Sequence, residues 1–266
     1  MGLLLDDAAR KHHFRVLAPD RPGIGRSDPQ SNRNFTHWPA DVRALATHYE
    51  LGHFAVLGVS GGGPYALATA HAMPEQTTAA SIVCGAPPLD VPSGTDGLLP
   101  MYHLLLRSYR SFPRLLRLAF RIGGPLMRHL LPDTLLRLAL RGHPAPDRAT
   151  LAGARNFAII FDGMRQSWAA CRDGVYEDAI LYARPWNFEP GQIRTPVEFW
   201  HGEMDINFPP EFARRLAATI PGAQLHVVPG EGHYSLPVNH ADTILASLVQ
   251  CARQDPAAAT AASRPG

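Results

Sequence analysis

Cysteine is scarce in this 266-residue chain. The three cysteines, Cys84, Cys171 and Cys251, lie far apart and form no C-x-x-C pair, which disfavours a zinc site and a disulfide framework. We therefore predict no metal site and no cofactor.

An odd cysteine count is typical of a reducing compartment. The apolar run Leu3–Leu5 is too short for a signal peptide, so we expect a cytoplasmic protein.

Long apolar runs and strong net charge are also missing. No stretch of 18 apolar residues occurs, which argues against a membrane-spanning helix. The formal net charge is only +2 and no nucleic-acid motif is present, so we expect a small-molecule substrate and no nucleic-acid partner. The oligomeric state stays open. The chain has 45% apolar and 18% charged residues, which are typical of globular proteins, and its length favours one domain with an insertion.

The sequence does contain a serine between glycines, Gly58-Val59-Ser60-Gly61-Gly62. The apolar run Phe54–Leu57 precedes it and the alanine-rich segment Gly63–Ala70 follows it, which indicates a strand, a tight turn and a helix. Glycines on either side permit a strained turn in which the serine side chain stands clear of the backbone. The pattern predicts a nucleophilic Ser60, and a glycine turn with an idle serine is the alternative.

Candidates for a base and an acid occur later in the chain. A serine nucleophile needs a base, and the base needs an orienting group. Asp205 follows the strand-like segment Thr195–Gly202, and His233 follows the strand-like segment Gln224–Pro229. Ligand sites of parallel sheets gather at the carboxyl ends of strands, where both residues are expected. Asp90 is a second candidate for the acid, and turn or loop roles are the alternative for Asp205 and His233.

These segments, together with Val16–Asp28, resemble the α/β-hydrolase superfamily, specifically its cap-bearing serine-hydrolase branch. The resemblance implies an α/β fold with a mostly parallel sheet, flanking helices and an inserted helical cap. It implies Ser60 as the nucleophile, Asp205 as the acid and His233 as the base. The N–H of Gly61 is implied as one oxyanion-hole donor.

The start of the chain departs from the family pattern. Family members carry further strands before the Val16 segment, and a loop there supplies the second oxyanion donor. This chain begins with a helix-like segment, residues 3–13. We therefore expect that the first strands and the oxyanion loop are missing, and that Met1 is not the native start. A truncated paralogue with little activity is the alternative, because losing one oxyanion donor lowers turnover about 100- to 1000-fold.

The remaining pattern divides the chain into a core and an insertion. We assign residues 1–90 and 186–254 to the α/β-hydrolase core, 91–185 to a helical cap, and 255–266 to a disordered tail. Apolar runs predict strands at 15–19, 54–58, 80–85, 195–202 and 224–229. Helical periodicity predicts helices at 3–13, 36–51, 64–73 and 239–252.

A row of arginines marks the predicted cap. Arg107, Arg110, Arg114, Arg117 and Arg121 recur at steps of three and four residues. On one continuous helix they would form the basic stripe of a membrane-surface helix. Because a proline at position 113 splits the segment, we interpret them instead as a solvated outer face, with the intervening apolar residues facing the pocket or the core.

Aromatic residues suggest an apolar pocket. We predict that Phe157, Phe161, Trp168 and Phe208 bind substrate, and core packing is the alternative. The whole pattern favours an esterase-like serine hydrolase acting on a small, largely apolar substrate. A non-catalytic or weakly active ligand-binding paralogue remains open. A proline iminopeptidase-like enzyme and a carbon–carbon bond hydrolase remain open as well.

Overall fold

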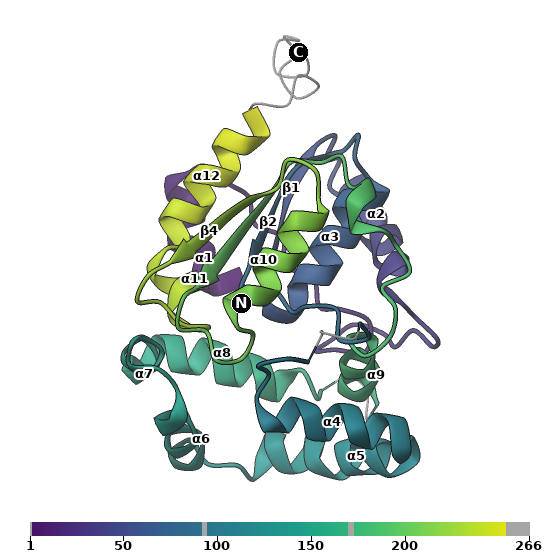
Figure 1. Ribbon diagram of the computed structural model, residues 1–266, viewed down its shortest axis with the longest axis vertical. Coiled ribbons are helices and arrows are strands. Elements are labelled where there is room, and N and C mark those ends of the chain that lie inside the picture. The colour runs from purple at the N-terminus through teal and green to yellow at the C-terminus, as the bar shows by residue number, and fades with distance from the viewer. Residues whose placement is uncertain (1, 92–94, 170–172, 254–266) are drawn as a thin grey trace.

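A parallel sheet lies at the centre of the molecule (Figure 1). The computed structural model describes residues 2–91, 95–169 and 173–253. Over these residues the sheet has four strands in the order β1-β2-β3-β4. They are β1 (Phe54–Val59), β2 (Thr77–Val83), β3 (Val197–Gly202) and β4 (Gln224–Val228). All neighbouring strands run parallel, which confirms the predicted α/β class.

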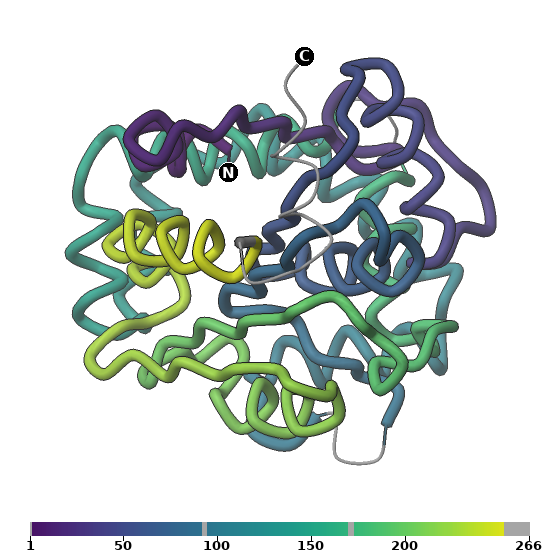
Figure 2. Tube along the Cα trace, turned by 90° about the horizontal axis from the view of Figure 1, so that it is seen from above, coloured from purple at the N-terminus to yellow at the C-terminus, as the bar shows by residue number. Residues whose placement is uncertain are grey.

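Helices cover both faces of the sheet. The view from above shows α10 (Pro210–Thr219) on one side of the strands and α12 (Ala241–Arg253) on the other (Figure 2). Residues along a strand point alternately to the two faces. Ile82 of β2 accordingly packs in the cluster that contains α10, whereas Val83 packs in the cluster that contains α12. Because both faces are covered, β2 and β3 are buried throughout.

Four of the helices that flank the sheet lie close to their predicted positions. α3 (Gly63–Ala72) follows β1 directly and packs on β1 and β2. The others are α1 (Gly2–Lys11), α2 (Trp38–His48) and α12. The short helix α11 (Ser235–Asn239) was not predicted. None of the described helices combines the length and the apolarity that crossing a bilayer requires.

The predicted strand at 15–19 is wrong. The structure gives these residues no regular secondary structure, and Val16 is 40% exposed. A strand forms only when its backbone groups pair with a neighbour. β1 is an edge strand of the described sheet and does not pair with this segment. An apolar run without an adjacent strand therefore remains irregular.

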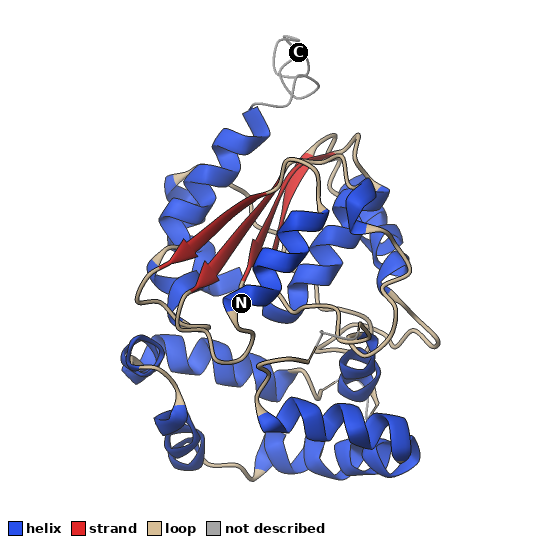
Figure 3. Cartoon of the chain, viewed as in Figure 1, coloured by secondary structure: helices blue, strands red, loops and turns tan. Residues whose placement is uncertain are grey.

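The described residues between β2 and β3 form helices and no strand (Figure 3). The helices are α4 (Pro100–Ser111), α5 (Pro113–His129), α6 (Asp133–Ala139), α7 (Ala145–Ala152), α8 (Ala154–Gln166) and α9 (Gly174–Leu181). We call them the helical insertion. The strand arrowheads point toward it, so it lies at the carboxyl edge of the sheet. The predicted tail, 255–266, lies outside the described residues.

Candidate active site

Ser60 lies at a strained turn between β1 and α3. Its φ of +53° falls in the left-handed region, which residues other than glycine rarely adopt. Gly58 is required nearby, because a Cβ atom there would collide with the carbonyl group of Gly62. The Ser60 carbonyl accepts a hydrogen bond from the Ala86 N–H at 2.9 Å, which ties the turn to the segment after β2. This geometry agrees with the predicted nucleophile turn.

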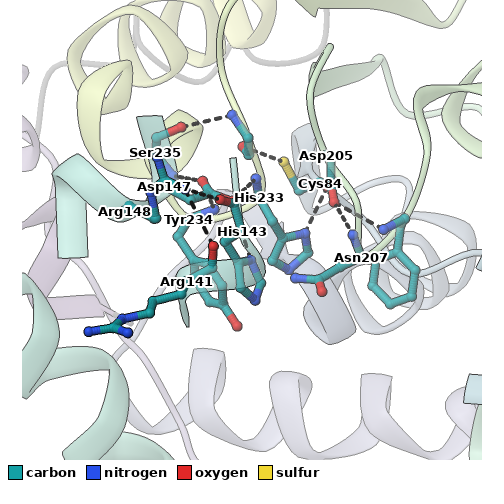
Figure 4. A network of polar contacts seen from close by, with 12 residues as sticks. Cys84, Arg141, His143, Asp147, Arg148, Asp205, Asn207, His233, Tyr234 and Ser235 are labelled. Carbon is teal, nitrogen blue, oxygen red and sulfur yellow. Dashed lines mark hydrogen bonds and ion pairs between the residues drawn. The ribbon is translucent and has the colours of Figure 1, made fainter. Parts of the chain in front are cut away.

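His233 connects Ser60 to Asp205. Its Nε2 atom lies 2.9 Å from Ser60 Oγ. Its Nδ1 atom lies 2.8 Å from Asp205 Oδ2 (Figure 4). Asp205 comes from the loop after β3 and His233 from the loop after β4. The structure thus brings the three residues together at the carboxyl edge of the sheet. Asp205, and not Asp90, contacts the imidazole.

The Asp205 carboxylate is buried and held from several sides. Its Oδ1 atom accepts hydrogen bonds from the backbone N–H groups of Asn207 at 2.8 Å and Phe208 at 3.0 Å. Burial opposes its charged form. The attraction of His233 and hydrogen bonds from His201 and His233 outweigh burial, so the pKa of Asp205 lies well below its usual range. Asp205 is therefore a fixed negative charge at neutral pH.

The His233 imidazole responds to that charge. Burial by itself would lower the imidazole pKa, but the attraction and the hydrogen bond of Asp205 raise it above its ordinary value. Its side chain is only 7% exposed. With Nδ1 directed at the carboxylate, Nε2 is the atom positioned to take a proton from Ser60 Oγ. The three side chains form one route for proton transfer.

Asp147, from α7 of the helical insertion, holds the loop that carries His233 (Figure 4). Its carboxylate is completely buried. It accepts backbone hydrogen bonds from His233 at 3.2 Å, Tyr234 at 2.9 Å and Ser235 at 2.9 Å. Burial opposes its charge, but His143 and these N–H groups hold the pKa of Asp147 below its ordinary value. The insertion thus fixes the backbone of the candidate base.

A second buried carboxylate of the insertion supports Gly61. The Gly61 carbonyl accepts hydrogen bonds from the Tyr182 hydroxyl at 2.7 Å and from Arg21 Nη1 at 3.1 Å. Arg21 Nη2 pairs with Asp178 of α9 at 2.9 Å. Asp178 also accepts hydrogen bonds from Arg33 at 2.8 Å. This network fixes the residue whose N–H is the predicted oxyanion donor.

The predicted substrate-binding residues separate into two groups. Phe208 lies beside the triad, with its ring 5.6 Å from the His233 ring. Phe157 and Phe161 are 2% and 4% exposed, and their tilted rings contact each other inside the insertion, so they pack rather than line an opening. Trp168 lies against Phe120 of α5, with ring centroids 5.8 Å apart. Only the placement of Phe208 supports contact with a substrate at Ser60.

Three side chains with metal-binding atoms also meet here. Cys84, Asp205 and His233 offer ligand atoms within 4.8 Å of one another. Both ring nitrogens of His233 are already engaged, one with Asp205 and one with Ser60. Burial raises the pKa of the Cys84 thiol well above its usual value, whereas metal binding requires the thiolate. The arrangement fits proton transfer better than metal binding.

Sequence reasoning missed Asp147 and Asp178. Asp147 lies in the first turn of α7, where an aspartate ordinarily complements the helix dipole. Its partner His233 is 86 residues away, and Asp178 is 145 residues from Arg33. No local pattern reports such contacts. The one indirect signal is Gly232, where a Cβ atom would collide with the Asp147 carboxylate.

Comparison with known proteins agrees with this fold. A family model described as the alpha/beta hydrolase fold matches residues 2–239. A non-heme chloroperoxidase of Streptomyces lividans is 41% identical over 91 residues, which is 33% of either chain. A proline iminopeptidase of Xylella fastidiosa is 25% identical over 90% of this chain and 82% of its own length. The chain spans 62% of the length of an uncharacterised Mycobacterium bovis relative.

Solved structures of other proteins have a similar fold. A bromoperoxidase from Bacillus anthracis superposes with a TM-score of 0.66 at 18% identity, covering 94% of this chain and 87% of the other. At that identity the likeness concerns the fold alone.

Proposed function

Because this chain belongs to the α/β-hydrolase fold family, we propose that it is a serine hydrolase that cleaves carboxylic esters by acyl transfer to water. The observation that carries the proposal is the continuous hydrogen-bonded series from Ser60 Oγ through His233 to Asp205. Such a series activates a hydroxyl that is otherwise a weak nucleophile.

In the first half-reaction, Ser60 Oγ attacks the ester carbonyl carbon while His233 Nε2 takes the hydroxyl proton. The carbonyl oxygen becomes an oxyanion beside the N–H of Gly61, which donates a hydrogen bond to it. The ester C–O bond then breaks, and the imidazolium returns its proton to the departing alkoxide. Asp205 remains charged because its pKa is low, and its negative charge stabilises the imidazolium throughout.

In the second half-reaction, water replaces the alcohol. His233 Nε2 takes a proton from water as the water oxygen attacks the acyl carbon on Ser60. Collapse of the second oxyanion breaks the acyl–Oγ bond, and the imidazolium returns its proton to Ser60. The products are a carboxylic acid and the free enzyme.

The substrate we propose is small and largely apolar. Phe208, beside His233, packs with Leu89, Leu98 and Leu106, and Tyr102 lies 5.5 Å from its ring. These largely buried side chains form an apolar cluster that reaches the candidate base through Phe208. An uncharged acyl or alcohol group at Ser60 would lie beside Phe208, where a charged group would lose its hydration.

A second candidate function is a proline iminopeptidase-like activity. The likeness to the Xylella protein over 90% of this chain favours it. It would use the same Ser60 and His233 on an amide that has a free amino-terminal proline. Carbon–carbon bond hydrolysis and ligand binding without turnover are further outcomes of the same test.

The test is a substrate panel. We expect p-nitrophenyl butyrate to be hydrolysed faster than prolyl-p-nitroanilide, with turnover lost by about 1000-fold or more in Ser60→Ala. Ser111→Ala, at an exposed serine at the end of α4, is the matched control and should retain full activity. Faster cleavage of the anilide would replace the esterase by the peptidase. Ester turnover that survives in Ser60→Ala would contradict both.

A further inference from the structure

Helix α5 of the insertion is apolar on two separate faces. On one face, Phe120 packs against Trp168 and Tyr176, with ring centroids 5.8 and 5.7 Å apart. Gly124 on the same face is buried against the Trp168 ring. This face joins α5 to the rest of the molecule.

The second apolar face is at least half exposed, although α5 also packs beside α4. Leu115, Leu118, Ile122 and Leu126 follow the spacing i, i+3, i+7 and i+11, which places them in one row along the helix. They are 63%, 50%, 64% and 51% exposed. Other large apolar side chains in and around α4 and α6 are at least half exposed as well: Met101, Leu104, Phe112, Leu130, Leu135 and Leu138. We call the row of four residues on α5 the apolar surface.

Ten large apolar side chains that are at least half exposed between residues 101 and 138 exceed what scattered surface residues explain. The sequence pattern predicted that the apolar residues between the arginines face the pocket or the core. Helical periodicity gives α5 two apolar rows, and it does not tell which of them is packed. The structure shows that only one of them is.

Arginines border the apolar surface. Arg114, Arg117, Arg121 and Arg128 lie on the side of α5 between the packed face and the exposed row. Arg117 and Arg121 pair with Asp173 at 2.7 and 2.6 Å. Arg114 and Arg128 are exposed and form no ion pair with a described residue.

The charge of this segment differs from that of the rest of the chain. Residues 100–141 contain eight arginines and one aspartate, a formal charge of +7. The remaining residues contain 17 basic and 22 acidic side chains, a formal charge of −5. The apolar surface is thus set in the positively charged part of an otherwise acidic molecule.

We propose that the apolar surface docks onto an anionic lipid bilayer, with α5 lying in the plane of the interface. Exposed leucine and isoleucine side chains enter the boundary between headgroups and acyl chains, and arginines beside them contact lipid phosphates. A second copy of the chain fits poorly, because the same surface would bring two segments of charge +7 together. The charge complementarity favours a negatively charged partner that also has an apolar interior.

Vesicle co-sedimentation of the full chain tests this docking. We expect binding to vesicles of phosphatidylglycerol and phosphatidylcholine, and at least ten-fold weaker binding to phosphatidylcholine alone. The pair Leu118→Gln with Ile122→Gln should weaken binding at least ten-fold. Arg114→Gln should weaken it about five-fold and should reduce its salt dependence.

Matched controls are available on helices outside the insertion. Leu3→Gln changes a leucine on α1 that is 65% exposed, and Arg43→Gln changes an exposed arginine on α2. Both should leave binding unchanged, and circular dichroism should show every variant folded. The proposal is overturned if the folded chain does not sediment with phosphatidylglycerol vesicles, or if it binds neutral vesicles equally well. It is also overturned if light scattering shows a dimer that dissociates in the variant with Leu118→Gln and Ile122→Gln. The apolar surface would then bind a second copy of the chain.

Discussion

The sheet and the helical insertion use their apolar residues in opposite ways. Every residue of β2 and β3 is buried between two layers of helices. In α5, by contrast, Gly124 is the only fully buried residue, and several leucines are at least half exposed. The sheet is stabilised by apolar burial on both faces. Apolar burial alone cannot stabilise the outer helices of the insertion, because many of their apolar side chains are exposed.

The difference shows what attaches the insertion to the site. Two of its aspartates are buried, and each connects to the backbone of the candidate site, Asp147 directly and Asp178 through an arginine. Asp147 holds the His233 loop, and Asp178 reaches Gly61 through Arg21. A buried carboxylate without partners is costly, so these contacts favour a single arrangement of insertion and sheet. In the proposed mechanism the loops of the sheet supply the reacting side chains, and the insertion holds the backbone at His233 and Gly61.

The largest effect should come from the sheet side. In Asp205→Asn, the amide can still accept the N–H bonds of Asn207 and Phe208, but its NH₂ group then faces His233. The imidazole would adopt the wrong tautomer, and we expect kcat for the ester to fall about 10⁴-fold. Steady-state kinetics measures the loss. A fall of less than ten-fold would show that Asp205 does not orient the base.

Removal of the insertion's contact should have the next largest effect. Asp147→Ala leaves three backbone N–H groups without their acceptor. We expect about 3 kcal/mol less stability toward urea. Misplacement of His233 should lower kcat by up to about 100-fold with little change in KM. Asp41→Ala, at an exposed aspartate of α2, is the control and should change neither. An unchanged kcat in Asp147→Ala would limit the insertion to a structural role.

The pH dependence sharpens the same comparison. His233 must be neutral to act as a base, so kcat/KM should fall about ten-fold per pH unit on the acid side. Because the pKa of His233 is raised, the midpoint should lie above 6.5. The charge of Asp147 contributes to that rise, so Asp147→Asn should move the midpoint downward. A midpoint that stays in place would show that Asp147 acts through structure alone.

The smallest effect should come from the Gly61 network. Tyr182→Phe removes one of the two hydrogen bonds to the Gly61 carbonyl and leaves that of Arg21. One neutral hydrogen bond is worth about 1 kcal/mol, so we expect kcat to fall about five-fold. Tyr109→Phe provides a comparison, since its hydroxyl bonds Arg184 instead. Equal effects of both changes would contradict a specific role of Tyr182.

Features that depend on residues close together in the sequence could be predicted, and features that depend on distant residues could not. Ser60, Asp205 and His233 each lie directly after an apolar run, and a parallel sheet brings the ends of such runs together. Their proximity was therefore predictable. The strand at 15–19 was not correctly predicted, because strand formation depends on a neighbour that an apolar run does not reveal. The role of Asp147 was not predicted, because its backbone partners are distant in sequence. The exposure of Leu118 was not predicted either, because helical periodicity does not tell which of two apolar faces is packed.

The most direct test of the account is fluorophosphonate labelling of the purified chain, followed by intact mass and peptide mapping. The reagent reacts with serines that an adjacent base activates. We predict one adduct on Ser60, none in Ser60→Ala, and strongly slowed labelling in His233→Ala. A folded chain that remains unlabelled, or that carries its adduct on another serine, would contradict the assignment of Ser60 as the nucleophile.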